Sequence, residues 1–337
     1  MRRPVTLLLV TALVLAIVPG WTGEARLRLL GRRAEVKVRA VALDPADPAR
    51  RRLGALDFLD GVELTSPDPA FGGFSALLVK GRRVTLLSDG GNIVAFTRGA
   101  NGQVTTPVFA NLPDGPGIGW DKADRDSESL AVDRATGRLW VGFEKYNMIM
   151  RFTPGFARSD GAVRPVAMRT WPDAGGPESL VRLPDGRFVS ISESARPPAK
   201  SWGARGGRGQ ARQGLIWAGD PVDAGQQPSR FTYLAEGKFD VADAAALPDG
   251  RLLVLERAFD APFRFHNRIV LVPAGAVRPG AVVKGALLAE LDAPLVHDNF
   301  EGITASQEGA DTVIWLVSDD NRTPVLQRTL LLRFRMR

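Results

Sequence analysis

Short runs of alternating apolar and polar residues recur along this 337-residue chain, with turn signals between them. One unit is repeated: an apolar strand, a tight turn, and a second apolar strand that ends on a carboxylate. The Asp-Gly pairs at 185–186 and 249–250 each lie between two apolar runs, which is the strongest short-range sign of a β-hairpin. The unit occurs at residues 74–89, where it is weakest, and at 127–144, 177–193, 241–256 and 300–319.

The spacing of these hairpins favours a β-propeller. They begin roughly 50 to 65 residues apart, and the intervals hold further strand-like runs such as 148–153 and 166–171, or 268–273 and 285–292. Four strands at such a period form one propeller blade. We therefore expect an all-β fold, a single β-propeller with five four-stranded blades. A sixth, diverged blade and a pair of β-sandwiches stay open as alternatives.

The two ends of the chain are expected to close the ring of blades. The last unit reaches only a third strand, at residues 329–337, and the apolar run at 53–64 has no hairpin partner of its own. Pairing the two segments would complete the last blade and cover sheet edges that otherwise invite aggregation. No interval resembles a linker, so residues 26–337 are interpreted as one propeller domain.

Carboxylates stand at matching positions of the repeated hairpins. Because the two strands of a hairpin are antiparallel, the start of the first lies beside the end of the second. If these are the inner strands of the blades, the carboxylates surround one mouth of the central channel. At the start of the first strand are Glu128, Glu178 and Glu301, and at the end of the second are Asp89, Glu144, Glu193, Glu256 and Asp319.

Clustered carboxylates repel one another and raise each other's pKa unless positive charge lies among them. A hard cation is one solution, since Ca²⁺ takes about six to eight oxygen ligands, and we expect Glu128, Glu178 and Glu301 to hold it. Turn capping or pairing with arginine across blades is the alternative for each acid. The candidate arginines are Arg196, Arg257, Arg268 and Arg322, and the amides that follow an acid closely are Asn92, Asn147 and Asn321.

The N-terminus has the pattern of a secretory signal. Arg2 and Arg3 precede an apolar run at residues 5–18, which is shorter than the roughly 20 residues that span a bilayer. Small residues next to Ala25 predict cleavage there. We therefore expect a signal peptide at residues 1–25 and a periplasmic or secreted protein without a stable membrane span. The basic stretch at 26–33 leaves an uncleaved anchor open as the alternative.

Composition excludes several classes of function. The chain has no cysteine, which excludes disulfides, thiolate nucleophiles and Cys-ligated zinc. It has only two histidines and no serine-hydrolase elbow, P-loop or dinucleotide-binding motif, which excludes a three-His zinc site and these enzyme classes. The net charge of +7 is not gathered into a stripe with aromatic residues, so we expect no nucleic-acid partner and a monomer. The segment 195–212, with five basic residues and no acid, is either a lid over an anionic ligand or a mobile surface loop.

A family resemblance rests on six short motifs in order along residues 50–337. They are FGGFSAL at 71–77, SDGGN at 88–92, DSESLAVD at 126–133, GPESL at 176–180, DNFEGI at 298–303 and WLVSDDN at 315–321. With these motifs the chain resembles the "esterase-like activity of phytase" family of exported bacterial propeller proteins. The resemblance implies hydrolysis of a phosphate ester or another ester, and a dependence on calcium like that of phytase propellers. No dense Lys/Arg/Tyr phosphate pocket accompanies it.

Two hypotheses of function follow. In the first, the protein is a Ca²⁺-dependent hydrolase of a small ester or phosphate ester, in which the cation activates water and Glu144, Asp319 or His297 assists by proton transfer. In the second, it is a non-catalytic propeller that binds a small ligand or a protein, with a structural cation. In both, the residues expected to contact the ligand are Asp89, Asn92, Asn147, Glu193, Arg257 and Asn321.

Overall fold

The computed structural model of the protein describes residues 2–17, 25–198, 211–261, 264–323 and 326–337. Within them the fold is almost entirely β: one α-helix, α1 (Arg2–Ile17), precedes the strands, and the later helical segments are short 3-10 turns. In the same part of the chain, no helix has both the length and the apolar character needed to cross a bilayer. Residues 18–24, next to the expected cleavage site, and 199–210, most of the expected lid, lie outside the described residues.

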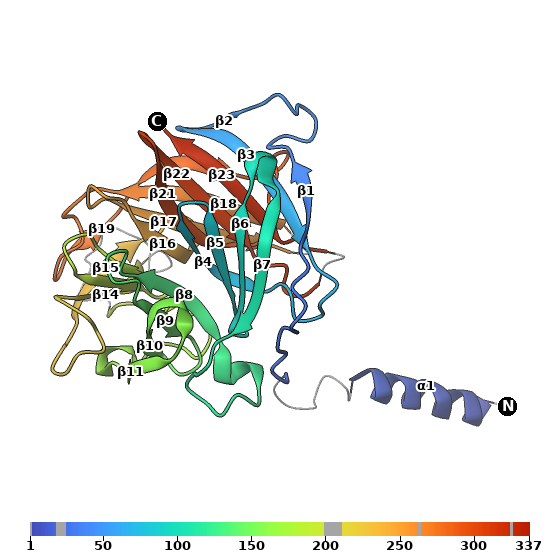
Figure 1. Cartoon of the computed structure of the whole chain (residues 1–337). Coiled ribbons are helices and arrows are strands. Elements are labelled where there is room, and N and C mark those ends of the chain that lie inside the picture. The colour runs from blue at the N-terminus through green and yellow to red at the C-terminus, as the bar shows by residue number, and fades with distance from the viewer. Residues whose placement is uncertain (1, 18–24, 199–210, 262–263, 324–325) are drawn as a thin grey trace.

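Five sheets are arranged as the blades of a propeller (Figure 1). Blade 1 contains β4 (Phe74–Lys80), β5 (Arg83–Ser88), β6 (Asn92–Arg98) and β7 (Val104–Asn111). Blade 2 contains β8 (Ser127–Val132), β9 (Leu139–Phe143), β10 (Met148–Phe152) and β11 (Ser159–Val163). Blade 3 contains β12 (Ser179–Arg182), β13 (Phe188–Ile191), β14 (Ala211–Trp217), β15 (Ser229–Leu234) and the short β19 (Val282–Val283). Blade 4 contains β16 (Asp240–Ala246), β17 (Leu252–Asp260), β18 (Arg264–Val272) and β20 (Ala286–Leu291).

Blade 5 combines the two ends of the chain, as expected. Its strands are β21 (Phe300–Glu308), β22 (Asp311–Ser318), β23 (Leu330–Met336), β3 (Leu56–Thr65) and β1 (Lys37–Val41), with β2 (Arg52–Leu53) beside β3. Figure 1 shows the last strands, in red, against the early strand β3, in blue. The antiparallel register of β23 and β3 pairs Leu331 with Val62 and Phe334 with Phe58. The prediction that terminal strands close the last blade is confirmed.

The first strand of each blade lies next to the central channel. β4 contacts β8, β8 contacts β12, β12 contacts β16, β16 contacts β21, and β21 contacts β4 again. The ring of inner strands is therefore complete, and five blades are confirmed.

The hydrophobic core is divided among the interfaces between blades. Each of five clusters of buried side chains joins two neighbouring blades within the described residues. Trp315 and Phe74 pack between blades 5 and 1, for instance, and Trp140 and Trp217 between blades 2 and 3. Both faces of a blade are thus covered, which explains why many strands are nearly continuous apolar runs.

One expected strand is wrong. Residues 166–171 do not form the outer strand of blade 2; they begin with the 3-10 turn η5 (Val166–Met168), after Pro165. Met168 and Trp171 are buried between blades 2 and 3, which accounts for the apolar pattern there. The outer strand is β11, whose sequence SDGAV is only weakly apolar because it is a partly exposed sheet edge.

Candidate functional site

A β-bulge recurs near the start of the inner strand in four described blades. The register between the first two strands skips one residue in each, and a bulge of this kind re-aims the extra side chain. The skipped residues are Ser75, Glu128, Ala242 and Glu301. The glutamates at this position in blades 2 and 5 are close enough for Glu301 to affect the pKa of Glu128 across the channel. Glu178 directly precedes β12 and takes the corresponding place in blade 3.

The end of the second strand brings another charged side chain to the same mouth. The backbone N–H of this residue donates a hydrogen bond to a carbonyl just before the inner strand. Glu144 donates to the Asp126 carbonyl (2.9 Å), and Asp319 donates to the Asn299 carbonyl (2.8 Å). The residues at this position are Asp89, Glu144, Glu193, Arg257 and Asp319. Blade 4 thus presents a guanidinium where the other blades present a carboxylate.

Glu256, which the sequence pattern placed at the mouth, is not there. Its carboxylate accepts a hydrogen bond from the hydroxyl of Tyr233 in blade 3, at 2.7 Å, and it is 2% exposed. Successive side chains of a strand point to opposite faces, so the next residue, Arg257, faces the channel mouth instead. The prediction that Glu256 lies at the mouth is wrong, and its neighbour Arg257 lies there instead.

Asp126 is a member of the mouth that the sequence pattern missed. It lies just before β8, and its side chain contacts Lys122. The one available signal was the acidic spacing in Asp126-Ser127-Glu128. We define the acidic ring as Asp89, Asp126, Glu128, Glu144, Glu178, Glu193, Glu301 and Asp319.

Three cations pair with the acidic ring in the described part of the chain. Lys122 bridges Asp89 (3.0 Å) and Asp126 (2.7 Å) at the border of blades 1 and 2. Arg257 bridges Glu193 (2.8 Å) and Glu301, and so connects blades 3, 4 and 5. Arg322 lies 3.3 Å from Asp89. These pairs account for part of the negative charge only.

The remaining carboxylates gather where blades 2 and 3 meet. Among the described ion pairs, none involves Glu128, Glu144 or Glu178. Asp126, Glu128 and Glu144 each place one carboxylate oxygen within 4.8 Å of the other two. Glu144 also accepts hydrogen bonds from the backbone N–H groups of Gly175 and Gly176, just before Glu178. We call these four acids the carboxylate sector of the ring.

Burial and mutual repulsion shift the protonation of this sector. Burial, and then the charges of Asp126 and Glu144, raise the pKa of Glu128 well above its usual range. Burial, and then Glu193 and Glu128, do the same to the pKa of Glu178. Across the ring, burial and the charges of Glu301 and Asp89 raise the pKa of Asp319. Protons, or a bound cation, are needed to neutralise these groups.

Two buried asparagines that were expected to contact the ligand have side-chain oxygens without a hydrogen-bond partner in the described structure. Asn147 is 1% exposed; its NH₂ group donates to the carbonyls of Trp171 (3.0 Å) and Pro172 (3.2 Å), while its Oδ1 has no hydrogen-bond partner in the described structure. A Cβ built on Gly176 would meet this Oδ1 at 2.6 Å and Cγ of Glu144 at 3.4 Å, so the free oxygen lies beside the carboxylate sector. Asn92, in blade 1, likewise leaves its Oδ1 unpartnered.

A cavity of about 260 Å³ opens around Arg257, where blades 3, 4 and 5 meet the ring. Its lining brings together four of the expected residues: Glu193, Arg257, Glu301 and Asn321. Phe259 and Phe265 add an apolar wall. The ring therefore combines a carboxylate sector with an adjoining cavity that has both charge and apolar surface.

His297 is not part of this arrangement in the described structure. The described hydrogen bond of its ring joins Nδ1 to the Leu295 carbonyl (2.7 Å), and no described contact connects it to the acidic ring. Arg268, also named from the sequence, instead stacks over Phe239 and lies 3.6 Å from Glu290, on blade 4.

Two solved structures are similar to this chain at low TM-score and low identity. The chain is similar to a Bacteroides thetaiotaomicron structural genomics protein of unknown function, with TM-score 0.45 and 11% identity over 90% of this chain and 76% of that one. It is also similar to the major Malassezia sympodialis allergen Mala s 1, with TM-score 0.42 and 11% identity over 92% of this chain and 95% of that one. A search of curated proteins finds no match.

A family model matches most of the chain. The model, described as "Phytase-like: Esterase-like activity of phytase", covers residues 69–322, and these include the whole acidic ring and all five inner strands. The resemblance that the six sequence motifs suggested is thereby confirmed. This chain belongs to the phytase-like family described as having the esterase-like activity of phytase.

Proposed function

We propose that the acidic ring binds a hard divalent cation, with Ca²⁺ as the first candidate, and that the protein hydrolyses an ester or phosphate ester beside it. The observation that carries this proposal is the convergence of Asp126, Glu128 and Glu144, whose oxygens lie within 4.8 Å of one another without a described ion pair to Glu128 or Glu144. Family membership supports the hydrolytic part.

The donor atoms suit such a cation. Carboxylate and amide oxygens are the ligands that Ca²⁺ prefers, and it accepts a flexible, high-coordination geometry. The three carboxylates, with Oδ1 of Asn147 and the carboxylate of Glu178 nearby, offer oxygens only. The ligand set expected from the sequence was Glu128, Glu178 and Glu301. The proposal now places Asp126 and Glu144 with Glu128 instead, because the oxygens of these three lie within 4.8 Å of one another, although Lys122 pairs with Asp126.

A bound cation would supply positive charge that polarises the ester and activates water. The residues of the chain do the rest. Arg257 fixes Glu193 and Glu301 at the wall of the 260 Å³ cavity, where the ester would lie, and Phe259 and Phe265 offer an apolar surface to its apolar part. Asp319, whose pKa is raised by burial, is the proposed proton donor to the leaving oxygen.

The decisive experiment compares calcium-dependent thermal stability with hydrolysis. A cation that binds only the folded state stabilises it by about 2.7 kcal/mol at a hundredfold excess over its dissociation constant. We expect Ca²⁺ to raise the melting temperature of the EDTA-treated protein, and Glu128→Gln to lose most of that shift. Glu308→Gln, at the other end of an inner strand and ion-paired with Arg333, is the matched control and should keep it.

Hydrolysis of p-nitrophenyl acetate and p-nitrophenyl phosphate is measured in the same samples. A calcium-dependent shift without hydrolysis of any ester would favour the second hypothesis, a binding propeller with a structural cation. The absence of a shift in the wild-type protein would eliminate the cation and the mechanism built on it.

We also propose that the protein is exported to the periplasm or secreted. The support is the apolar segment that forms α1, followed by small residues before Ala25. Mass spectrometry of the natively expressed protein should find a mature N-terminus near Arg26; a retained Met1 in a membrane fraction would contradict export with cleavage.

A further inference from the structure

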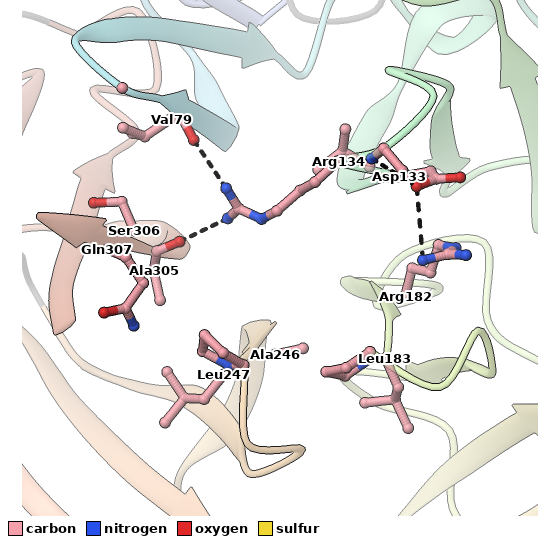
Figure 2. A pocket seen from close by; sticks show the side chains of 15 residues that line it. Val79, Asp133, Arg134, Arg182, Leu183, Ala246, Leu247, Ala305, Ser306 and Gln307 are labelled. Atoms are coloured by element: carbon pink, nitrogen blue, oxygen red, sulfur yellow. Dashed lines mark hydrogen bonds and ion pairs between the residues drawn. The ribbon is translucent and has the colours of Figure 1, made fainter.

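The far mouth of the channel holds a larger cavity than the acidic mouth. All five inner strands begin at the acidic ring, and their opposite ends line a space of about 550 Å³. Figure 2 shows this space, with residues from every blade around it. They include Val79 of blade 1, Arg182 of blade 3, Ala246 of blade 4 and Ala305 of blade 5. A volume of this size is typical of sites for small organic ligands.

Arg134 extends across this cavity from the turn that follows β8 (Figure 2). Its guanidinium donates to the backbone carbonyls of Val79 (3.4 Å) and Ala305 (2.7 Å), in blades 1 and 5. In the described structure no carboxylate forms an ion pair with it. These two bonds use only some of the five N–H groups of a guanidinium, which stays charged in proteins. Arg134 therefore places an exposed positive charge, without a described carboxylate partner, at the cavity.

The one carboxylate in the lining is already neutralised. Asp133 accepts hydrogen bonds from the backbone N–H of Ala135 (2.9 Å) and the hydroxyl of Thr136 (2.9 Å), and it lies 3.8 Å from Arg182. The Asp133–Arg182 pair thus adds no net charge. The lining as a whole carries a single positive charge, that of Arg134.

The rest of the lining is mainly apolar. Leu183 and Leu247 are buried side chains at its floor, next to Pro184, Pro248 and Val132. Ser306 and Gln307 add neutral polar groups on one side. Such a surface complements a molecule with one anionic group and an apolar body, because the body covers the apolar part of the lining while the anion meets the guanidinium.

We propose that this cavity binds a small monocarboxylate with an apolar body, its carboxylate held by Arg134. A guanidinium matches the two oxygens of a carboxylate in a planar, two-bond geometry. The lining's one net positive charge balances a monoanion, whereas a phosphate dianion would exceed it by one negative charge. The site is separate from the acidic ring and does not depend on the function proposed there.

Octanoate is the probe, with octanol and octyl phosphate as its uncharged and dianionic counterparts. Isothermal titration of the full-length protein should detect octanoate binding at least tenfold tighter than binding of either counterpart. Arg134→Gln keeps amide donors for the backbone carbonyls but removes the charge, and it should weaken octanoate binding at least tenfold. Arg82→Gln is the matched control, because Arg82 is exposed, lies in the β4–β5 turn and also donates to a backbone carbonyl.

A second variant keeps the test decisive if Arg134→Gln does not fold. Ala246→Leu fills part of the cavity without touching Arg134, and it should also weaken octanoate binding while octanoate still binds Arg82→Gln. Equal affinity for octanoate and octanol, or octanoate binding that survives both Arg134→Gln and Ala246→Leu, would overturn the proposal. Tighter binding of octyl phosphate would overturn the assignment to carboxylates.

Discussion

Glu256 and Arg257 are adjacent in the sequence and have opposite roles. Arg257 turns to the channel mouth and bridges two acids of the ring, whereas Glu256 is buried against blade 3 with Tyr233. Burial, opposed by the Tyr233 hydrogen bond and by Arg268, raises the pKa of Glu256 from 4.5 to about 7. At this residue the alternation of a β-strand decides which side chain serves the site and which one serves the core.

The raised pKa of Glu256 predicts that the free energy of unfolding falls as the pH rises. Its folded-state pKa lies above its unfolded-state value, so the folded protein binds the proton more tightly. The effect on stability is therefore favourable below pH 4.5, is lost as the pH rises toward 7, and amounts to roughly 3 kcal/mol. Glu256→Gln should gain stability over the wild type between pH 5 and pH 7.5, measured by urea unfolding. A difference that does not vary with pH would contradict this account.

A variant at Asp319 tests the catalytic hypothesis independently of the cation site. It is 4% exposed, and it has no described contact with Asp126, Glu128 or Glu144. If it donates the proton to the leaving oxygen, Asp319→Asn should lower kcat by about 100-fold or more. The calcium-dependent shift in melting temperature should stay, because the proposed ligands are untouched. Wild-type kcat in Asp319→Asn would assign the proton donor elsewhere.

At the level of the elements, bulges and hairpin ends bring charges of different blades together. The bulge residue of β21, Glu301, and the end of β13 supply the two carboxylates, and β17 supplies the guanidinium between them. The three side chains are largely buried, so the link is expected to resist screening by salt. It fastens three blades at the mouth, where the inner strands begin.

Removing Arg257 should be more damaging than removing the whole link. Arg257→Met leaves Glu193 and Glu301 largely buried without this cationic partner, which typically costs about 3–5 kcal/mol. Adding Glu301→Gln and Glu193→Gln to it should restore much of the loss, because no unpaired charge remains. Urea unfolding in EDTA measures the free energy of unfolding of the wild type, of Arg257→Met and of the triple variant. If the triple variant is no more stable than Arg257→Met, unpaired charge is not the cause.

At the level of the whole molecule, closure makes the blades interdependent. Each core cluster belongs to two blades, and blade 5 exists only because β23 pairs with β3. Asp57 of β3 reinforces this pairing through Arg335 (3.2 Å) and Arg337 (2.8 Å). We therefore expect the propeller to unfold as one unit rather than blade by blade.

Phe334 tests this cooperativity. It is fully buried on β23, packs on Phe58 of β3 and belongs to the core between blades 4 and 5. Phe334→Ala should cost about 3–5 kcal/mol and lower the melting temperature of the whole protein in a single transition. Circular dichroism and tryptophan fluorescence should report the same midpoint, since Trp140, Trp171 and Trp217 are buried between blades 2 and 3, away from Phe334. An early transition confined to one probe would show that blade 5 opens separately.

The sequence by itself determined the propeller, the closing strands and most of the acidic ring. Turn residues, strand alternation and the Asp-Gly hairpins are local properties, so their repetition is visible in the sequence. They placed Glu128, Glu178, Glu301, Asp89, Glu144, Glu193 and Asp319 at one mouth. The weakly apolar edge strand β11 was missed because little of it is buried.

Only the tertiary structure decided which charges meet. A one-residue step in register exchanged Glu256 for Arg257, and contacts across blades tied Glu301 to Arg257 while leaving Asp126, Glu128 and Glu144 together. The cavity around Arg134 likewise needs all five inner strands before it exists. Such neighbours are far apart in the chain, and their proximity depends on bulges and on closure of the ring, which residue spacing does not encode.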